Sequence, residues 1–329
     1  MIIGHKKQWQ LLKKSVELGK ISHAYLFFGQ EKLGKKALAF EFAKLLNCQD
    51  SDLSKRPCQK CLSCKAIQKS ATQNIEQHPD LAILEPQKLV SKKTSQRKEE
   101  IQISQIRDII WRLSLHSFSS PFKIAIIDKA HFMNQEAQSC FLKTLEEPKG
   151  DTVLILITEY PEALFPTIRS RVQKIKFNPV EKKEIEDFLK SQNVPDEKAK
   201  DISSFSFGKP GLALEFFNGL KNFENQKQKI NSLLKITSKN STISSRFNCA
   251  RDITSENSDL KETLEIWLRF FRNILILRVG KNKEKEECFR DYSIPKLETI
   301  INLIQNTIFL ISKTNINQKL ALENFMLEL

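Results

Sequence analysis

The chain has 329 residues, 40% of them hydrophobic and 28% charged, a composition typical of a soluble globular protein with two or three domains. No apolar run of about 18 residues occurs, which excludes a predicted membrane span, and the N-terminus lacks the apolar core of a secretion signal, so we expect a cytoplasmic protein. The formal net charge of +14 favours contact with nucleic acid, although a lysine-rich soluble surface explains it equally well.

The first part of the chain alternates predicted strands with predicted helices. Ser104 is the expected N-cap of the third helix, and the polar residues 87–100 are expected to form a surface loop. Such alternation predicts a mostly parallel sheet covered by helices on both faces. Helices are expected at 5–19, 34–47, 103–115 and 134–148, and strands at 24–29, 80–86, 123–128, 152–158 and 172–177.

The remainder of the chain contains no convincing strand. Helical segments begin after residue 178, are interrupted at Gly208, Pro210 and Gly211, and resume near Leu212. Residues 258–279 are apolar nearly all round a helix, which predicts a buried one. The sequence therefore predicts an α/β part followed by an all-α part.

A phosphate-binding loop is indicated by GQEKLGKK at residues 29–36, between the first strand and the second helix. Gly29, Gly34 and Lys35 fit the pattern G-x-x-x-x-G-K, whose backbone N–H groups and lysine hold phosphates. The next position normally carries the Ser or Thr that holds magnesium, and here it is Lys36. A strand–turn–helix corner without a ligand is the alternative interpretation.

A second nucleotide-type element ends the strand at 123–128. Asp128 stands where such folds place a magnesium-coordinating carboxylate. The following residue is Lys129, where hydrolysing enzymes of this kind carry a glutamate that orients the attacking water. Two separate losses, at Lys36 and Lys129, favour an inactive site.

Two arginines follow the fourth strand in FPTIRSRVQ, at positions 169 and 171. An arginine projecting from this part of the surface can reach the γ-phosphate of a neighbouring subunit as an arginine finger. A surface arginine paired with a carboxylate is the alternative for both residues.

Four cysteines crowd into residues 48–64, and the last three are separated by two residues each. In a cytoplasmic protein such clustering indicates a metal site rather than disulfides. Four thiolates can close a tetrahedral zinc shell, which would be structural because no position remains for water. Unrelated thiols are the alternative. The proposed ligands are Cys48, Cys58, Cys61 and Cys64.

At this point the chain resembles the AAA+ clamp-loader subunits of bacterial DNA polymerase III. The similarity is dense over residues 1–178, weaker to about residue 220, and architectural beyond. The segments that carry it are GHKKQWQLLKKSVELGKISHAYLFFGQEKLGKKALAFEFAKLLNC, HPDLAILEP, KIAIIDKAHFMNQEAQSCFLKTLEEP and LFPTIRSRVQ.

The resemblance implies three domains and a set of partners. An AAA+ domain with the zinc module at 48–64 would cover 1–178, a helical lid 179–220, and a helical collar domain 221–329. The collar would join the chain to delta and gamma/tau subunits in a hetero-pentamer. That ring would act on the sliding clamp and on primer–template DNA, with no membrane involved.

The resemblance also assigns roles to individual residues. Ser170, Arg171 and Val172 stand for the family's Ser-Arg-Cys motif, so Arg171 would be an arginine finger acting in trans. Gly211 occupies the place of a sensor arginine in active subunits, and Thr158 that of a polar first sensor.

These assignments predict a non-hydrolysing, stator-type subunit inside the DNA polymerase III holoenzyme, a DNA-directed DNA polymerase and hence a nucleotidyltransferase complex. ATP would bind other subunits and would not be hydrolysed by this chain. An active AAA+ ATPase of the gamma/tau class is the alternative. A zinc-dependent DNA-binding protein is a third, although no base-reading helix of the finger type adjoins the cysteines.

Overall fold

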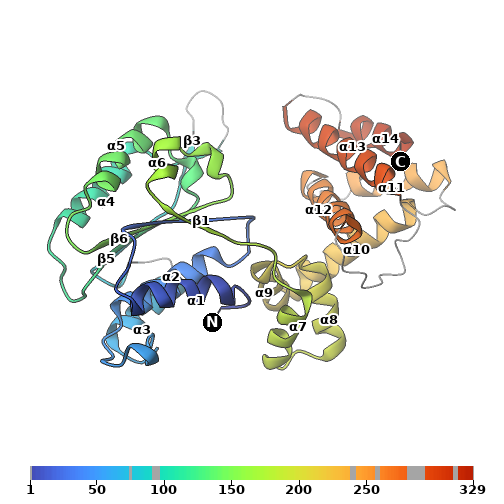
Figure 1. The fold of residues 1–329 in the computed structure, drawn as a ribbon. Helices are drawn as coiled ribbons and strands as arrows, with labels where there is room; N and C mark the ends of the chain where they lie inside the picture. The colour runs from blue at the N-terminus through green and yellow to red at the C-terminus, as the bar shows by residue number, and fades with distance from the viewer. Residues whose placement is uncertain are drawn as a thin grey trace. The chain divides into compact units, whose positions relative to one another are not determined.

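The computed structural model describes residues 2–73, 76–90, 97–237, 242–255, 260–279, 293–313 and 318–328. Contacts divide the chain into two compact units, Met1–Ala213 and Leu214–Leu329. The first contains a helix-covered parallel sheet and the second contains helices (Figure 1). The predicted fold class is confirmed, whereas the predicted domain boundaries after residues 178 and 220 stay predictions.

Five parallel strands form the sheet of the first unit. Their branched and aromatic side chains suit a pleated surface that is covered on both faces, and β5 and β6 are buried at every residue. The order across the sheet is β2 (Leu81–Leu84), β5 (Lys123–Ile127), β6 (Thr152–Thr158), β1 (Ala24–Phe28) and β7 (Gln173–Lys176).

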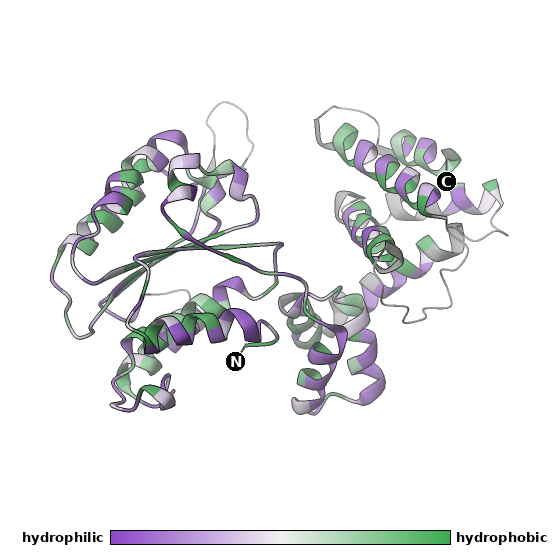
Figure 2. Cartoon of the chain, viewed as in Figure 1, coloured by the Kyte–Doolittle hydropathy of each residue, from purple (hydrophilic) through white to green (hydrophobic). Residues whose placement is uncertain are grey.

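Two helical layers cover the sheet, because alternate strand residues point to opposite faces. Tyr25 and Phe27 belong to the buried cluster that includes residues of α1, α2 and α3, whereas Leu26 belongs to the cluster with α4, α5 and α6 (Figure 1). Hydrophobic residues extend along α2 (Figure 2). These helices are α1 (Lys6–Glu17), α2 (Lys35–Asn47), α3 (Leu62–Gln73), α4 (Ile103–Ser114), α5 (Gln135–Glu146) and α6 (Pro166–Ser170).

Residue Ser104 is not the N-cap of α4, so that prediction was wrong. The N-cap is Gln102, whose backbone N–H donates to the side chain of Gln105 at 3.0 Å. This reciprocal use of the third helical residue is the capping-box arrangement, and it starts the helix earlier than a Ser104 cap allows.

The predicted loop at 87–100 is instead partly a hairpin. β3 (Gln87–Val90) pairs antiparallel with β4 (Arg97–Glu100), and the residues between them lie outside the described part. A two-stranded ladder is held by backbone hydrogen bonds, so its strands do not require the apolar pattern on which the prediction relied. Glu99 in β4 pairs with Lys129 at 3.1 Å, which ties the hairpin to the end of β5.

Three short helices complete the first unit and lead out of it. A backbone hydrogen bond of 2.8 Å from Val180 to Gly208 joins the two ends of this segment. An ion pair of 3.2 Å between Lys6 and Glu184 connects α1 with α7. The helices are α7 (Lys182–Ser191), α8 (Asp196–Phe205) and α9 (Pro210–Asn218).

The second unit is built from helices around an aromatic centre. Trp267 is fully buried, lies 5.9 Å from the ring of Phe325, and donates its indole N–H to Lys229 O at 3.0 Å. A helix is confirmed over Leu260–Val279, with residues 258 and 259 outside the described part. It is not buried all round as predicted, since Ile276 is 62% exposed. The helices are α10 (Leu220–Thr237), α11 (Ile243–Ser255), α12 (Leu260–Val279), α13 (Ile294–Lys313) and α14 (Gln318–Glu328). Among the described helices, none is both long enough and apolar enough to cross a bilayer.

Candidate functional site

The glycines of the loop between β1 and α2 are required by its backbone. Gly29 has φ 146°, and a Cβ there would lie 2.5 Å from Phe177 O. Gly34, with φ 93°, is the N-cap of α2. Both conformations are costly for any residue with a side chain, so the sequence folds locally into a turn that places the start of α2 beside a hollow.

The hollow has a volume of about 290 Å³. Elements from several parts of the first unit meet there, because the parallel strands β1, β5 and β6 end along the same edge. It is lined by Glu31, Lys32, Gly34, Lys35, Lys36, Asp128, Lys129, His131, Ile157, Thr158, Glu159 and Gly211.

The side chain of Lys35 is buried and turned back onto its own loop. Its ammonium donates to Gly29 O at 2.6 Å and to Gln30 O at 2.5 Å. Burial lowers the pKa of Lys35 to about 8, with Asp128 and Glu31 opposing the shift. In a phosphate-binding loop the lysine ammonium contacts phosphates. Here the ammonium of Lys35 is already hydrogen-bonded to two carbonyl oxygens of its own loop.

The ammonium of Lys36 takes the place that a metal cation would need. It forms a hydrogen-bonded ion pair with Glu85 and lies 3.8 Å from Asp128 Oδ2. Burial raises the pKa of the Asp128 carboxyl, while Lys36 opposes that shift. A magnesium ion bound to Asp128 would have to share this space with a fixed positive charge, so the residues present do not fit the metal.

The neighbouring side chain, Lys129, is directed to Glu99 rather than left free to act as a base. Its backbone is left-handed, with φ 50°, and its ammonium lies 3.1 Å from the Glu99 carboxylate. Burial works against the charged form, but the hydrogen bond and charge of Glu99 outweigh it and raise the pKa of Lys129. The group therefore stays protonated at neutral pH and cannot accept a proton from water.

His131 and Thr158 also line the hollow. His131 Nδ1 lies 3.1 Å from Thr158 Oγ1, which also accepts the backbone N–H of Tyr160 at 3.1 Å. Burial, followed by the charge of Lys129, lowers the pKa of His131. The Thr158 hydroxyl is thus already bonded within the chain.

Residue Gly211 is packed against the loop itself. Its N–H donates to Lys32 O at 2.8 Å, and a Cβ would meet that oxygen at 2.9 Å and Lys32 Cα at 3.1 Å. Contacts this short require the loop or α9 to shift. An arginine side chain at 211 would therefore have to begin where the loop backbone already lies.

The arginines after β6 lie outside the lining of this hollow. Arg171 caps α6, lies 2.8 Å from the Glu146 carboxylate, and donates to Thr167 O at 3.0 Å. Ser170 donates to the same carbonyl at 3.0 Å, and Arg169 is paired with Glu162. With 38% of its side chain exposed, Arg171 is held at the surface by a partner that a stronger anion can displace.

The four clustered cysteines come together as a candidate metal centre. Their Sγ atoms all lie within 4.8 Å of one another, whereas a tetrahedral shell with bonds of about 2.3 Å needs sulfurs about 3.8 Å apart. Small rotations reach that geometry. The ligands come from the end of α2 (Cys48), the turn that follows (Cys58 and Cys61) and the start of α3 (Cys64).

Backbone N–H groups are directed at these sulfurs. Cys58 N–H donates to Cys48 Sγ, Cys61 N–H to Cys58 Sγ, and Cys64 N–H to Cys61 Sγ, each at 3.4 Å. N–H groups of Lys60 and Cys61 lower the pKa of the Cys58 thiol to about 6, whereas burial raises the pKa of Cys48 and Cys64. An all-sulfur donor set suits zinc or an iron–sulfur centre, so the cluster fits a structural metal.

Residues Glu85 and His131 were missed by sequence reasoning. Glu85 lies at the end of the predicted strand 80–86, next to Pro86, so a carboxylate at the carboxyl end of a parallel strand was an available signal. His131 offered none, because its contact with Thr158 depends on the short helix η2 (Ala130–Phe132) that follows β5.

Comparison with known proteins places the first part of the chain in a known family. Residues 4–181 match the family described as DNA polymerase III, delta subunit. The chain is 36% identical over 197 residues to the DNA polymerase III subunit delta' of Bacillus subtilis, covering 60% of this chain and 54% of that one. It is 31% identical over 213 residues to a DNA polymerase III subunit gamma of Buchnera aphidicola, covering 63% and 54%.

These alignments span about half the length of the curated relatives. Among solved structures, a gamma subunit-related protein of Thermotoga maritima aligns over 97% of both chains, with 19% identity and a TM-score of 0.47.

The buried ammonium of Lys35 gives a pH-dependent prediction. Its pKa of about 8 in the folded chain lies below the unfolded value of about 10.4. Between these values the unfolded chain binds more protons, so stability rises with pH there. We expect the free energy of unfolding of the wild type, relative to that of Lys35→Met, to increase as the pH rises above about 8.

Urea titrations of both proteins across this range measure the difference, and contributions of other groups cancel. A difference that stays constant or falls with pH contradicts the buried state of Lys35.

Proposed function

The chain belongs to the DNA polymerase III delta-subunit family, and from this membership we propose that it is the delta-prime, stator-type subunit of a bacterial clamp loader, without ATP hydrolysis of its own. In this proposal it works in the cytoplasm within a hetero-pentamer. The ring contains delta and gamma/tau subunits and loads the sliding clamp onto primed DNA. The chain contributes a rigid AAA+ domain and an arginine to a neighbour's ATP site.

The ion pairs of Lys36 are the observation that carries the proposal. An ATPase of this fold binds nucleotide together with a magnesium ion that neutralises charge developing on the phosphates. Here the ammonium of Lys36 lies 3.8 Å from Asp128 and pairs with Glu85. Since that charge is covalently attached, it cannot leave with product or be exchanged for a hydrated cation.

The contacts of Lys129 and Gly211 support the same conclusion independently. Lys129 is kept protonated by Glu99, and Gly211 is packed on the backbone of Lys32. In this proposal, contacts internal to the chain would take the place of three functions of an ATP site, namely metal binding, water activation and phosphate sensing.

A catalytic contribution remains available at Arg171. In the isolated chain its guanidinium pairs with the exposed carboxylate of Glu146 at 2.8 Å. A triphosphate on a neighbouring subunit carries more negative charge and accepts a bidentate guanidinium, so it would replace Glu146 when the ring assembles. Ser170 would hold the end of α6 through its bond to Thr167.

The cysteine cluster would bind one zinc ion. All four ligands are sulfur, the cluster is half-buried, and backbone N–H groups stabilise its thiolates. A closed shell of this kind contributes folding energy and performs no chemistry. It would fix α3 against the end of α2.

An active ATPase of the gamma/tau class is the competing function, since Lys35 and Asp128 are both present in the hollow. The isolated chain distinguishes the two. We expect titration with a fluorescent ATP analogue to give no gain in affinity on adding magnesium, and no turnover. Lys36→Thr should introduce magnesium-dependent binding without turnover, because Lys129 remains protonated.

Micromolar affinity for ATP with magnesium, together with turnover by the wild-type chain, supports the gamma/tau class instead. Asp128→Asn in the Lys36→Thr background is the control, since it should abolish any gain from magnesium.

Removal of the proposed arginine finger tests the role in trans. Arg171→Ala should leave the reconstituted ring assembled and reduce ATP hydrolysis at one neighbouring site by about 10³–10⁵-fold. Single-turnover hydrolysis by the ring measures this loss. Arg169→Ala is the matched control, because it removes the adjacent guanidinium from the same short helix.

The role of Arg171 is refuted if its variant hydrolyses ATP like the wild type. Equal losses from the two variants would show that α6 is disturbed as a whole.

Metal analysis tests the cysteine site. We expect about one zinc per chain in the purified protein, lost in Cys61→Ser together with a lower melting temperature, because the metal contributes to folding. Cys140→Ser is the control, since Cys140 lies outside the cluster. Iron in place of zinc, or unchanged zinc in Cys61→Ser, contradicts the assignment.

A further inference from the structure

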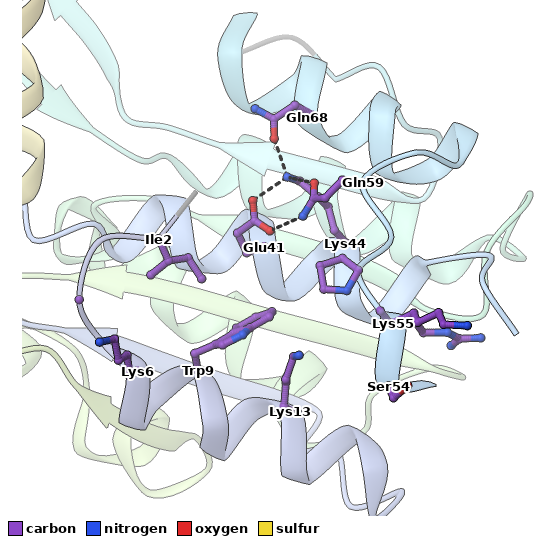
Figure 3. A pocket seen from close by; sticks show the side chains of 13 residues that line it. Ile2, Lys6, Trp9, Lys13, Glu41, Lys44, Ser54, Lys55, Gln59 and Gln68 are labelled. Carbon is purple, nitrogen blue, oxygen red and sulfur yellow. Dashed lines mark hydrogen bonds and ion pairs between the residues drawn. The ribbon is translucent and has the colours of Figure 1, made fainter. Parts of the chain in front are cut away.

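A second hollow lies on the first unit, lined by different residues from the nucleotide-type site. It has a volume of about 710 Å³, and α1, α2 and the loop before α3 enclose it (Figure 3). We call it the basic pocket. Its lining consists of Ile2, Gly4, Lys6, Trp9, Lys13, Glu41, Lys44, Ser54, Lys55, Arg56, Pro57, Gln59 and Gln68.

The inner wall of the basic pocket is a closed polar network. The ammonium of Lys44 is buried and donates to Glu41 at 2.6 Å, Gln59 at 3.0 Å and Gln68 at 2.5 Å. Gln59 donates in turn to the other Glu41 oxygen at 2.9 Å (Figure 3). Since the charges of Lys44 and Glu41 compensate each other, this wall has no net charge.

One side of the pocket is a stripe along α1. Lys6, Trp9 and Lys13 are separated by three and four residues, which places them on the same face of a helix. Figure 3 shows the side chains of Trp9 and Lys13 directed into the pocket and Lys6 at its edge. The ammonium of Lys13 lies 5.7 Å from the centre of the Trp9 ring. Lys6 and Lys13 lie about 10 Å apart along the helix axis, with Trp9 between them in the sequence.

The opposite side carries two more cations, Lys55 and Arg56. Arg56 is held by a hydrogen bond of 2.6 Å from its Nε to Asp50 O. Lys55 pairs with Asp52 at 3.3 Å, but 72% of its side chain is exposed, so this pair is weak and exchangeable. On the α1 side, Lys6 pairs with Glu184 at 3.2 Å, and 79% of its side chain is exposed, so this pair is exchangeable as well. Apart from Lys44, which Glu41 compensates, the lining holds four cations, of which Lys6 and Lys55 have exposed carboxylate partners.

We propose that the basic pocket binds single-stranded DNA, with a base stacked on Trp9 and the flanking phosphates held by Lys6, Lys13, Lys55 and Arg56. Cations spaced around an aromatic plane are the combination that single-stranded nucleic acids require. An acidic peptide would use the cations but would leave the indole face without a matching group. The choice of DNA over RNA rests on the proposed clamp-loader function, which brings the chain to a primed template.

Binding of a short fluorescein-labelled oligo-dT to the isolated full-length chain tests the proposal, independently of any ATPase measurement. Trp9→Leu keeps apolar packing but removes the stacking plane, and should weaken binding at least about fivefold. Trp9→Phe keeps an aromatic plane and should retain most of the affinity. Thermal melting of both variants checks that the chain is folded.

Charge reversal provides a matched pair on the same helix. Lys13→Glu should weaken binding and reduce the slope of log affinity against log salt by about 0.7 for each phosphate that is no longer neutralised. Lys14→Glu changes the net charge identically at a residue outside the lining, and should have much the smaller effect.

Equal effects of Lys13→Glu and Lys14→Glu would overturn the proposal, because only overall charge would then matter. Competition by polyglutamate as effective as competition by oligo-dT, with Trp9→Leu unchanged, would also overturn it and would indicate an acidic-peptide site.

Discussion

The common ending of three parallel strands is the constraint on which the nucleotide-type site depends. β1, β5 and β6 are paired in register, with Phe28 opposite Thr158 and Ile127 opposite Leu156. Every loop that leaves their carboxyl ends therefore starts from the same edge of the sheet. This brings the loop before α2, Asp128 and Thr158 around one hollow, although they are far apart in sequence.

Because the site joins residues that are far apart in sequence, the sequence predicts only some of its features. The sheet follows from continuous apolar runs, and the cysteine cluster from short spacings, since both patterns are local. The partnership of Lys36 with Glu85 is not local, because it requires β2 to lie beside β5. The contact of Gly211 with Lys32 depends on where α9 packs, and helix propensity does not indicate the packing position of a helix. The hairpin at 87–100 was missed because a backbone ladder leaves little trace in side-chain pattern.

Two kinds of charge compensation occur in the first unit. Lys36 and Lys44 are covalently attached cations with carboxylate partners, Glu85 and Glu41 respectively, so these regions are electrostatically complete without a ligand. The cysteine cluster is the opposite case, because deprotonated thiols brought this close repel one another unless an ion joins them. A few residues therefore decide whether a region of this unit needs an added cation.

The backbone contact between Gly211 and Lys32 limits which substitutions position 211 can accept. When a residue is lost from a site and its space stays empty, a single reverse mutation restores it. Here the loop itself fills the space, since a Cβ at position 211 would lie 2.9 Å from Lys32 O. A substitution to arginine at 211 would therefore cost stability, because the loop or α9 would have to shift to make room for the side chain. In the proposed stator role, no single substitution would restore an ATP site, because this contact and the ammonium groups of Lys36 and Lys129 are separate obstacles.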